Sequence, residues 1–272
     1  DSKIIYLNFK KIILYKEPAI PEIDIKQLTN FLEKHFPIQV EIKDNIFKQF
    51  SMKNINQLSN SRISNIKNPF SEHKSSSIEI EFEKKLCQDS SLMNTTVKVE
   101  DAKEINQVFM YDGFELQRIL RCFNDNNETI HIILTNRLTC TFDENDERYH
   151  ARAVICANPA IISITGIIEA PAKPREYYFE VMSLKAQGLR IDSVKEKYKA
   201  KVLEYNDKRL TKVLEGYILQ IIFYNITGES FCEDIKCRLN NAHWQKDLLL
   251  SQVTIGELCK KHKDILTRIN NV

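Results

Sequence analysis

Near the C-terminal end, four potential metal ligands constrain the fold more than any other feature of the chain. Cys232, Cys237, Cys259 and His262 form a C-x4-C-x21-C-x2-H array. A structural zinc ion takes four nitrogen or sulfur ligands at tetrahedral corners. The array supplies two close pairs, whereas three unlinked thiols and a surface histidine would have no reason to be paired. The sequence therefore predicts one structural zinc ion bound by these four residues.

The remaining cysteines, Cys87, Cys122, Cys140 and Cys156, lie singly in apolar or turn-like contexts. Such cysteines are typically ordinary buried thiols. Because the chain has an odd number of cysteines at irregular spacing, the sequence does not indicate a disulfide framework. Reduced thiols favour a reducing compartment, so we expect a cytoplasmic protein.

Composition limits the classes of partner. The chain has 272 residues, enough for one large domain or two small ones, with a formal net charge of +2 and 28% charged residues. This balance gives no electrostatic reason to expect nucleic acid or a membrane as partner. No apolar run is long enough to span a bilayer, and the start lacks the form of a signal peptide. The six glycines form neither a Walker loop nor a Gly-x-Gly-x-x-Gly turn, so no nucleotide is expected.

The N-terminal third reads as a β-α-β unit followed by a polar segment. Residues 12–15 and 38–42 have strand patterns, and Asp24 is placed to cap a helix between them. This order predicts a pair of parallel strands. Residues 54–77 are rich in Asn, Ser and Lys with little periodicity, which predicts a weakly ordered linker or insertion.

The middle of the chain supplies most of the expected sheet. Residues 78–82 alternate apolar and acidic side chains, which predicts an edge strand, and residues 112–123 have helical spacing. Residues 129–135 are β-branched and apolar on both faces, so we expect a central strand. Residues 151–155 and 160–168 predict two further strands.

The last part of the chain is expected to be helical. Residues 193–206 form an amphipathic pattern, and residues 208–226 are apolar on more than one face, so the second helix should be buried beneath the sheet. The overall prediction is an α/β or α+β fold with a twisted mixed sheet and a small C-terminal subdomain stapled by zinc. The expected segments are 1–53 (β-α-β), 54–77 (linker), 78–230 (remaining core) and 231–272 (zinc knuckle).

The cysteine spacing and the apolar helix before it resemble the archaemetzincins, a branch of the metzincin-like zinc peptidases. In that family a helix with His-Glu-x-x-His-x-x-Gly-x-x-His is followed by Cys-x4-Cys-x-Met, and a Cys-x2-Cys completes a structural zinc site. The resemblance places the four ligands of this chain on that site, with His262 in place of the last Cys. Gly228 falls on the motif glycine and Leu239 on the Met.

The catalytic half of the motif does not carry over. Ile221, Asn225 and Phe231 stand where the family has its three zinc histidines, and Ile222 stands where it has the general-base Glu. A catalytic zinc needs three protein ligands and an open position for water, and Ile and Phe cannot be ligands. The resemblance therefore implies a metallopeptidase homologue that keeps a structural zinc ion and has lost the catalytic one.

The resemblance also implies where a partner would bind. Residues 132–170 are similar to an uncharacterised archaeal family described as metallopeptidase candidates, and residues 160–168 resemble the edge strand against which a substrate peptide lies in metzincins. An open edge can accept a peptide by β-augmentation. We therefore expect a peptide or protein partner in a cleft beside residues 160–168.

Another constellation could replace the lost catalytic ligands. His150 and His243 would lie near the old cleft if the archaemetzincin layout holds, and nearby carboxylates could join them. The alternative function is then an active zinc metallopeptidase with relocated ligands. Each histidine also has an ordinary interpretation: His150 bonds a neighbouring carboxylate, and His243 stabilises the zinc knuckle. No Gly-x-Ser-x-Gly elbow supports a serine hydrolase.

Overall fold

The computed structural model describes residues 7–17, 22–68, 73–90, 97–98, 104–105, 109–124, 126 and 128–270. The chain divides into two compact units. The first unit holds the described parts of residues 1–7, 20–37 and 168–272, and the second holds residues 8–19 and 38–167. Together they give a mixed α/β protein, as the sequence predicts. No helix among the described residues is both long and apolar enough to cross a membrane.

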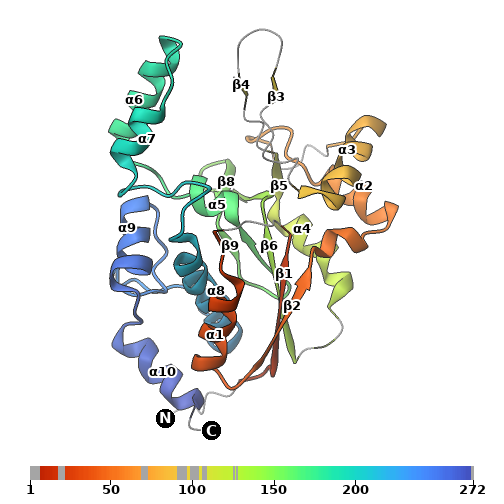
Figure 1. Ribbon diagram of the computed structural model, residues 1–272. Coiled ribbons are helices and arrows are strands. Elements are labelled where there is room, and N and C mark those ends of the chain that lie inside the picture. The colour runs from red at the N-terminus through yellow and green to blue at the C-terminus, as the bar shows by residue number, and fades with distance from the viewer. Residues whose placement is uncertain are drawn as a thin grey trace. The chain divides into compact units, whose positions relative to one another are not determined.

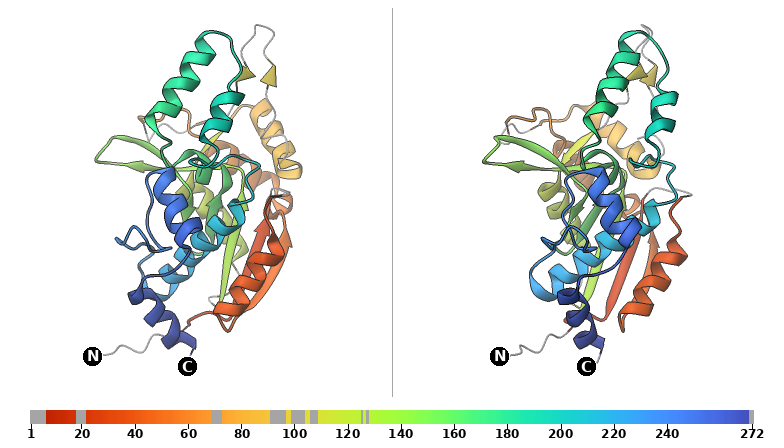
Figure 2. Two further views of the ribbon diagram at one scale, coloured as in Figure 1. Left: turned by 60° about the vertical axis from the view of Figure 1, so that its left-hand side comes forward. Right: turned by 90° about the vertical axis from the view of Figure 1, so that its left-hand side faces the viewer.

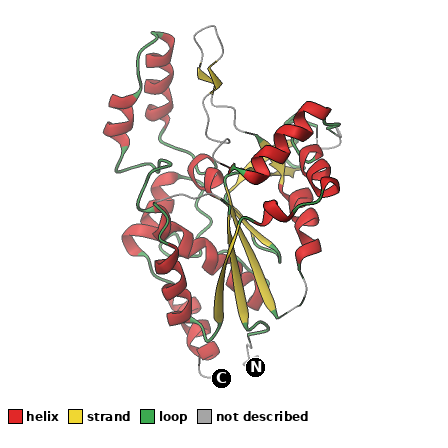
Figure 3. Ribbon diagram, turned by 45° about the vertical axis from the view of Figure 1, so that its right-hand side comes forward, coloured by secondary structure: helices red, strands yellow, loops and turns green. Residues whose placement is uncertain are grey.

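The second unit is built on a five-stranded mixed sheet in the order β2-β1-β6-β10-β9 (Figures 1 and 3). The first four strands run parallel and β9 runs antiparallel to β10. The expected parallel pairing of the first two strands is confirmed. The strands are β1 (Lys11–Lys16), β2 (Gln39–Asp44), β6 (Thr129–Thr135), β9 (Val154–Ile155) and β10 (Ala160–Ser163).

Strand β6 lies at the centre of this sheet, between β1 and β10. All seven of its residues are buried. His131 is among them, and its Nδ1 lies 3.1 Å from the hydroxyl of Tyr15 on β1. The prediction of a central strand is therefore confirmed, and His131 is packed within it.

The expected edge strand over residues 160–168 is wrong in two respects. Strand β10 ends at Ser163, and helix α5 (Ile164–Glu169) follows, because the Ser163 hydroxyl accepts the N–H of Gly166 at 2.8 Å. In addition, β10 is paired on both sides, with β6 and with β9. The edge on this side of the sheet is β9, which has only two residues.

Further elements of the second unit include a three-stranded sheet in the order β5-β7-β8, with β5 parallel and β8 antiparallel to β7. Helix α4 matches the helix expected over residues 112–123, and Asp112 caps it by accepting the N–H groups of Phe114 and Glu115. The elements are β3 (Val97–Lys98), β4 (Glu104–Ile105), β5 (Met110–Asp112), β7 (Leu138–Asp143), β8 (Arg148–Arg152), α2 (Met52–Asn60), α3 (Ser77–Gln88), α4 (Gly113–Leu120) and the 3₁₀ helices η1 (Ile46–Gln49) and η3 (Arg121–Phe123).

Residues 78–82 form a helix rather than the expected strand. They belong to α3, which begins with a capping box between Ser76 and Glu79. The alternation of apolar and acidic residues suits a strand, but reciprocal capping satisfies the first backbone N–H groups of a helix. The helix then buries Glu83, Leu86 and Cys87 on one face, a spacing of three and four residues.

Part of the expected linker over residues 54–77 is also helical. Helix α2 starts with a second capping box, between Ser51 and Asn54, and buries Ile55 and Leu58. Local capping and these two apolar side chains therefore order a stretch whose composition is polar. The wider division of the chain into four segments stays a prediction.

A fully buried network of charged side chains lies inside the second unit. Arg137 forms ion pairs with Glu17 and Glu83, and the side chains of all three are 0% exposed. Glu83 also pairs with Arg62 and accepts the hydroxyl of Tyr111 at 2.8 Å. Two arginines thus neutralise two carboxylates. Buried charges are tolerated when they are paired and hydrogen-bonded in this way.

The first unit is helical, and α8 is its most buried helix. Every residue of α8 from Leu210 to Phe223 except Lys212 is buried, which confirms a buried helix over the predicted range. Helices α6 and α7 lie side by side as a hairpin (Figure 2). Helix α7 ends at Tyr198, so the helix expected over residues 193–206 is shorter than predicted. The helices are α1 (Ile25–His35), α6 (Arg175–Ala186), α7 (Asp192–Tyr198), α8 (Leu210–Thr227), α9 (Gln245–Leu249), the π-helical segment η4 (Leu250–Ile255) and α10 (Lys260–Asn270).

Candidate metal centre

The four predicted metal ligands lie together in the first unit. The N–H of Cys232 donates to the carbonyl of Leu239 at 2.8 Å. This hydrogen bond closes a tight loop that contains both Cys232 and Cys237, the first pair of ligands. Cys259 precedes α10, and His262 N–H donates to the Cys259 carbonyl at 3.1 Å, so the second pair occupies the start of that helix. A loop and a helix start thus bring the two pairs face to face.

The distances between the ligand atoms fit a tetrahedral zinc ion. All four atoms lie within 4.8 Å of one another. Zinc bonds of about 2.3 Å to sulfur and about 2.0 Å to nitrogen imply tetrahedral edges of roughly 3.5 to 3.8 Å. The Sγ atoms of Cys232 and Cys259 are 3.9 Å apart, and Cys237 Sγ lies 3.7 Å from His262 Nδ1. The 3.0 Å between Cys259 Sγ and His262 Nδ1 is a shorter edge. The donor set and its size therefore match the ion.

Backbone groups also prepare the cluster for a metal. Cys237 Sγ accepts the N–H groups of Leu239 at 3.5 Å and of Cys259 at 3.4 Å. Cys237 is 1% exposed and His262 is 4% exposed. Hydrogen bonds from the protein to metal ligands orient them and tune the bound ion. These two N–H groups therefore favour the thiolate form of Cys237, whereas burial of the sulfur opposes it.

Burial sets the protonation of the metal-free ligands. It raises the pKa of Cys232, and it raises the pKa of Cys237 to about 12. Burial lowers the pKa of His262, and the charge of Lys261 lowers it further. A neutral imidazole is the form that binds metal, whereas each thiol must lose its proton. Metal binding at this cluster therefore releases protons from the cysteines.

The positions that the resemblance assigns to a catalytic zinc lie along and just beyond α8. Ile221 and Ile222 are 0% exposed and contribute to the core. The Asn225 side-chain amide donates to the Ile221 carbonyl at 2.8 Å, and Phe231 is exposed. Gly228 ends the helix in the left-handed conformation, with φ of 80°, which explains a glycine at this point. Ile221 and Ile222 therefore belong to the core, Gly228 ends the helix, and Phe231 lies at the surface.

The two weaker candidates have other contacts. His150 on β8 is half-buried, and its Nε2 lies 2.7 Å from the carboxylate of Asp146. His243 is exposed, and its backbone carbonyl accepts the N–H of Ala172 at 2.8 Å. Within the part of the chain that the structure describes, the Cys232, Cys237, Cys259 and His262 cluster is the group able to hold a metal, and neither histidine belongs to such a group.

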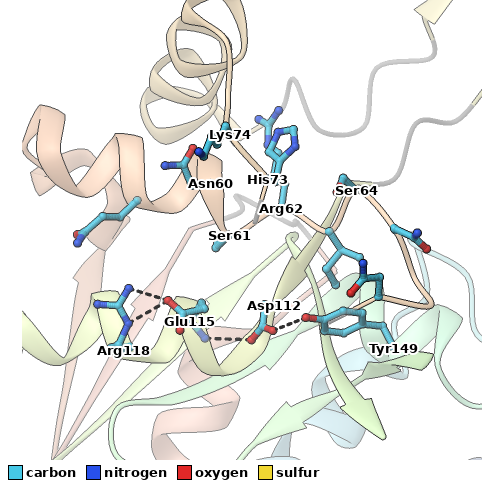
Figure 4. Close-up of a pocket in the computed structure, with 14 residues that line it drawn as sticks. Asn60, Ser61, Arg62, Ser64, His73, Lys74, Asp112, Glu115, Arg118 and Tyr149 are labelled. Carbon is cyan, nitrogen blue, oxygen red and sulfur yellow. Dashed lines mark hydrogen bonds and ion pairs between the residues drawn. The ribbon is translucent and has the colours of Figure 1, made fainter. Parts of the chain in front are cut away.

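A pocket of about 590 Å³ lies in the second unit (Figure 4). Figure 4 shows Arg62, His73 and Lys74 on one side of it and Asp112 and Glu115 on the other. Sequence patterns did not reveal this pocket, because residues from α2, α4 and β8 that are distant in the chain form it. Its lining residues are Gln57, Asn60, Ser61, Arg62, Ile63, Ser64, Asn65, Asn68, His73, Lys74, Asp112, Glu115, Arg118 and Tyr149.

Much of the charge in this pocket is already paired. The hydroxyl of Tyr149 donates to Asp112 at 2.7 Å, and Arg118 Nε donates to Glu115 at 2.9 Å (Figure 4). His73 Nε2 lies 3.0 Å from Glu79. The remaining surface is rich in side-chain amides and hydroxyls, which can both donate and accept hydrogen bonds. The pocket therefore suits a polar ligand.

Comparison with known proteins gives a match over nearly the whole chain. The model of a family described as "Probable metallopeptidase family (DUF6775)" matches residues 8–269. No curated protein matches. Archaemetzincin (amzA) from Methanopyrus kandleri has 10% identity over 97% of each chain, with a TM-score of 0.43. A zinc-dependent peptidase from Methanocorpusculum labreanum has 12% identity over 94% of this chain and 99% of that one, with a TM-score of 0.41.

Proposed function

Because the chain belongs to the probable metallopeptidase family, we propose that it is a homologue that binds one structural zinc ion and a peptide or protein partner without cleaving it. The predicted metallopeptidase relationship is confirmed by the family match. The loss of catalysis and the binding of a partner are the proposal.

One observation carries the proposal: the metal-binding group on the described residues has four protein ligands. Three thiols and one imidazole occupy all four corners of a tetrahedral zinc ion. Catalytic zinc instead keeps a position open for water, whose pKa it lowers to about 7. A closed site of this kind holds the fold together and gives a bound peptide no metal-activated nucleophile.

Zinc content and peptidase activity test the absence of catalysis. We expect one zinc ion per chain by elemental analysis of protein purified without added metal. With zinc saturated, we expect no hydrolysis of a mixed peptide substrate. His150→Ala and His243→Ala should then leave metal content and activity unchanged. Two zinc ions per chain, or hydrolysis that either substitution abolishes, would support the alternative of an active peptidase with relocated ligands.

We propose the pocket in the second unit as the partner site. The expected cleft beside residues 160–168 lacks an open strand edge, since β9 pairs with Ile161 and Ile162. The pocket offers both signs of charge and several amides, which suit the polar backbone and the charged groups of a peptide. Lys74 is exposed and has no ion-pair partner among the described residues, so it is available to a carboxylate of the partner.

A matched pair of lysine substitutions tests the partner site. A peptide selected from a random library on the full chain should bind about threefold to tenfold more weakly to Lys74→Gln, because one attractive charge is lost. Lys53→Gln removes the same charge from an exposed position on α2 outside the pocket lining and should leave affinity unchanged. Calorimetric titration measures both. Equal affinities in the two variants would remove the pocket from the proposal.

A cytoplasmic location is part of the proposal. Cys232, Cys237 and Cys259 belong with His262 to the metal-binding group. Thiols that ligate metal must stay reduced, and a reducing compartment keeps them so.

A further inference from the structure

A second pocket, of about 360 Å³, lies within the first unit. Side chains from α1 form one part of its lining, residues from α8 form another, and Arg238 and Gly256 come from the chain around the metal-binding group. The lining residues are Gln27, Asn30, Phe31, Lys34, His35, Lys212, Glu215, Arg238 and Gly256. No residue of the candidate metal centre or of the pocket in Figure 4 belongs to it.

Arg238 is the buried cation of this pocket. The residue is 3% exposed, and its guanidinium stacks on the ring of Phe31, with 5.2 Å from Cζ to the ring centroid. Its Nη2 donates to Glu215 at 2.8 Å and to the Lys212 carbonyl at 2.7 Å. Its Nε is buried and has no hydrogen-bond partner among the described residues. A buried N–H without an acceptor is rare and calls for a ligand or an ordered water.

The charge around Arg238 favours an anion. Lys34, Lys212 and Arg238 line the pocket together with a single carboxylate, that of Glu215. Both oxygens of Glu215 are occupied: Oε1 accepts the Gln27 amide at 2.8 Å, and Oε2 lies 2.8 Å from Arg238 and 3.8 Å from Lys212 Nζ. Lys34 is exposed and has no ion-pair partner on the described residues. Positive charge therefore remains after the internal pair is counted.

The metal-binding loop fixes Arg238 in place. Arg238 directly follows the ligand Cys237. Its backbone N–H donates to the Glu257 carbonyl at 2.9 Å, and its carbonyl accepts the side-chain amide of Gln252 at 2.7 Å. An arginine whose backbone N–H and carbonyl are both hydrogen-bonded loses little further conformational freedom when its guanidinium binds a ligand. The donor is therefore preorganised.

From the unpartnered Nε, the surplus of positive charge and the fixed backbone, we propose that this pocket binds a small oxyanion, a phosphate or a carboxylate group. Arg238 Nε donates to one oxygen of the anion, and the ammonium groups of Lys34 and Lys212 balance its charge. Charge-assisted hydrogen bonds of this kind are stronger than neutral ones. Inorganic phosphate and acetate represent the two sources of such a group.

The test is a titration of the zinc-loaded full chain with inorganic phosphate and, separately, with acetate. We expect saturable heat with at least one of them and a shift of the Arg238 Nε signal in a ¹H–¹⁵N spectrum. The double variant Lys34→Gln, Lys212→Gln should weaken binding at least about tenfold, because two charges facing the anion are lost. Lys26→Gln lies on the same helix α1, is exposed and is outside the lining, so it should bind as the unaltered chain does.

The outcomes of the titrations show which kind of anion binds and whether the proposal holds. Binding of phosphate alone identifies a phosphate-bearing ligand, and binding of acetate alone identifies a carboxylate. Arg238→Lys should abolish the binding while retaining a positive charge beside Glu215. If that variant does not fold, the double variant Lys34→Gln, Lys212→Gln still tests the proposal. No saturable binding of either anion, or equal affinity in the double variant and in Lys26→Gln, would overturn the proposal. Neither result depends on the peptide partner.

Discussion

Cys237→Ser is expected to release the zinc ion and unfold the C-terminal segment that carries its ligands. A serine hydroxyl is a poor zinc ligand, and Cys237 accepts two backbone N–H groups that hold the two ligand pairs together. Structural zinc contributes on the order of 10 kcal/mol in small zinc domains, which is comparable to the stability of a whole domain. The zinc content should therefore fall from one per chain to near zero, and residues 231–272 should become sensitive to protease.

The matched control for this experiment is Cys122→Ser. Cys122 is exposed, and its thiol donates to the carbonyl of Ile119 rather than to the metal-binding group. Zinc content and melting temperature should be those of the unaltered chain. An unchanged metal content and melting temperature in Cys237→Ser would refute the zinc site. Addition of a chelator to the unaltered chain should reproduce the protease sensitivity of the variant.

Arg137→Met is expected to destabilise the second unit by about 3 to 5 kcal/mol. Methionine fills a similar volume, but it leaves the buried carboxylates of Glu17 and Glu83 without the cation that both contact. An uncompensated buried charge costs more than the lost attraction alone, because the carboxylates cannot return to water. The guanidinium also packs on Phe47, 4.0 Å from its ring centroid, and that contact is lost too.

Urea unfolding measures the change, with a surface ion pair as the reference. Lys10→Met breaks the pair of Lys10 with Glu128, in which the two side chains are 80% and 64% exposed. Exposed pairs contribute at most about 1 kcal/mol, so this variant should unfold close to the unaltered chain. A loss of stability in Arg137→Met no larger than that in Lys10→Met would contradict the account of the buried network.

Local patterns in the sequence gave several elements correctly, for definite reasons. The run of β-branched residues over 129–135 could be buried on both faces only in a central strand, and β6 is one. The apolar residues of α8 cover more than one face, which requires a buried helix. The paired spacing of Cys232, Cys237, Cys259 and His262 predicted that they lie together, because each close pair needs only a loop or a helix start to form. The structure places all four together.

The predictions that failed depended on contacts or caps beyond the pattern. Residues 78–82 alternate like a strand, but the Ser76 and Glu79 capping box begins a helix there. Residues 160–168 are mostly apolar, and the hydrogen bond from the Gly166 N–H to the Ser163 hydroxyl marks where the strand ends and the helix begins. Whether β10 is an edge could not be read from its own sequence, since the answer depends on pairing with β9.

The sequence by itself determined the metal-ligand set and the main buried elements, because ligand spacing and hydrophobic periodicity are properties of short stretches of chain. The tertiary structure alone decided which strands lie at the sheet edge, that Arg137 meets Glu17 and Glu83, and that Arg238 lines a pocket with Lys34 and Lys212. The reason is physical: pairing and burial of charges join residues that are far apart in the chain, and no local pattern records which distant partner each side chain finds.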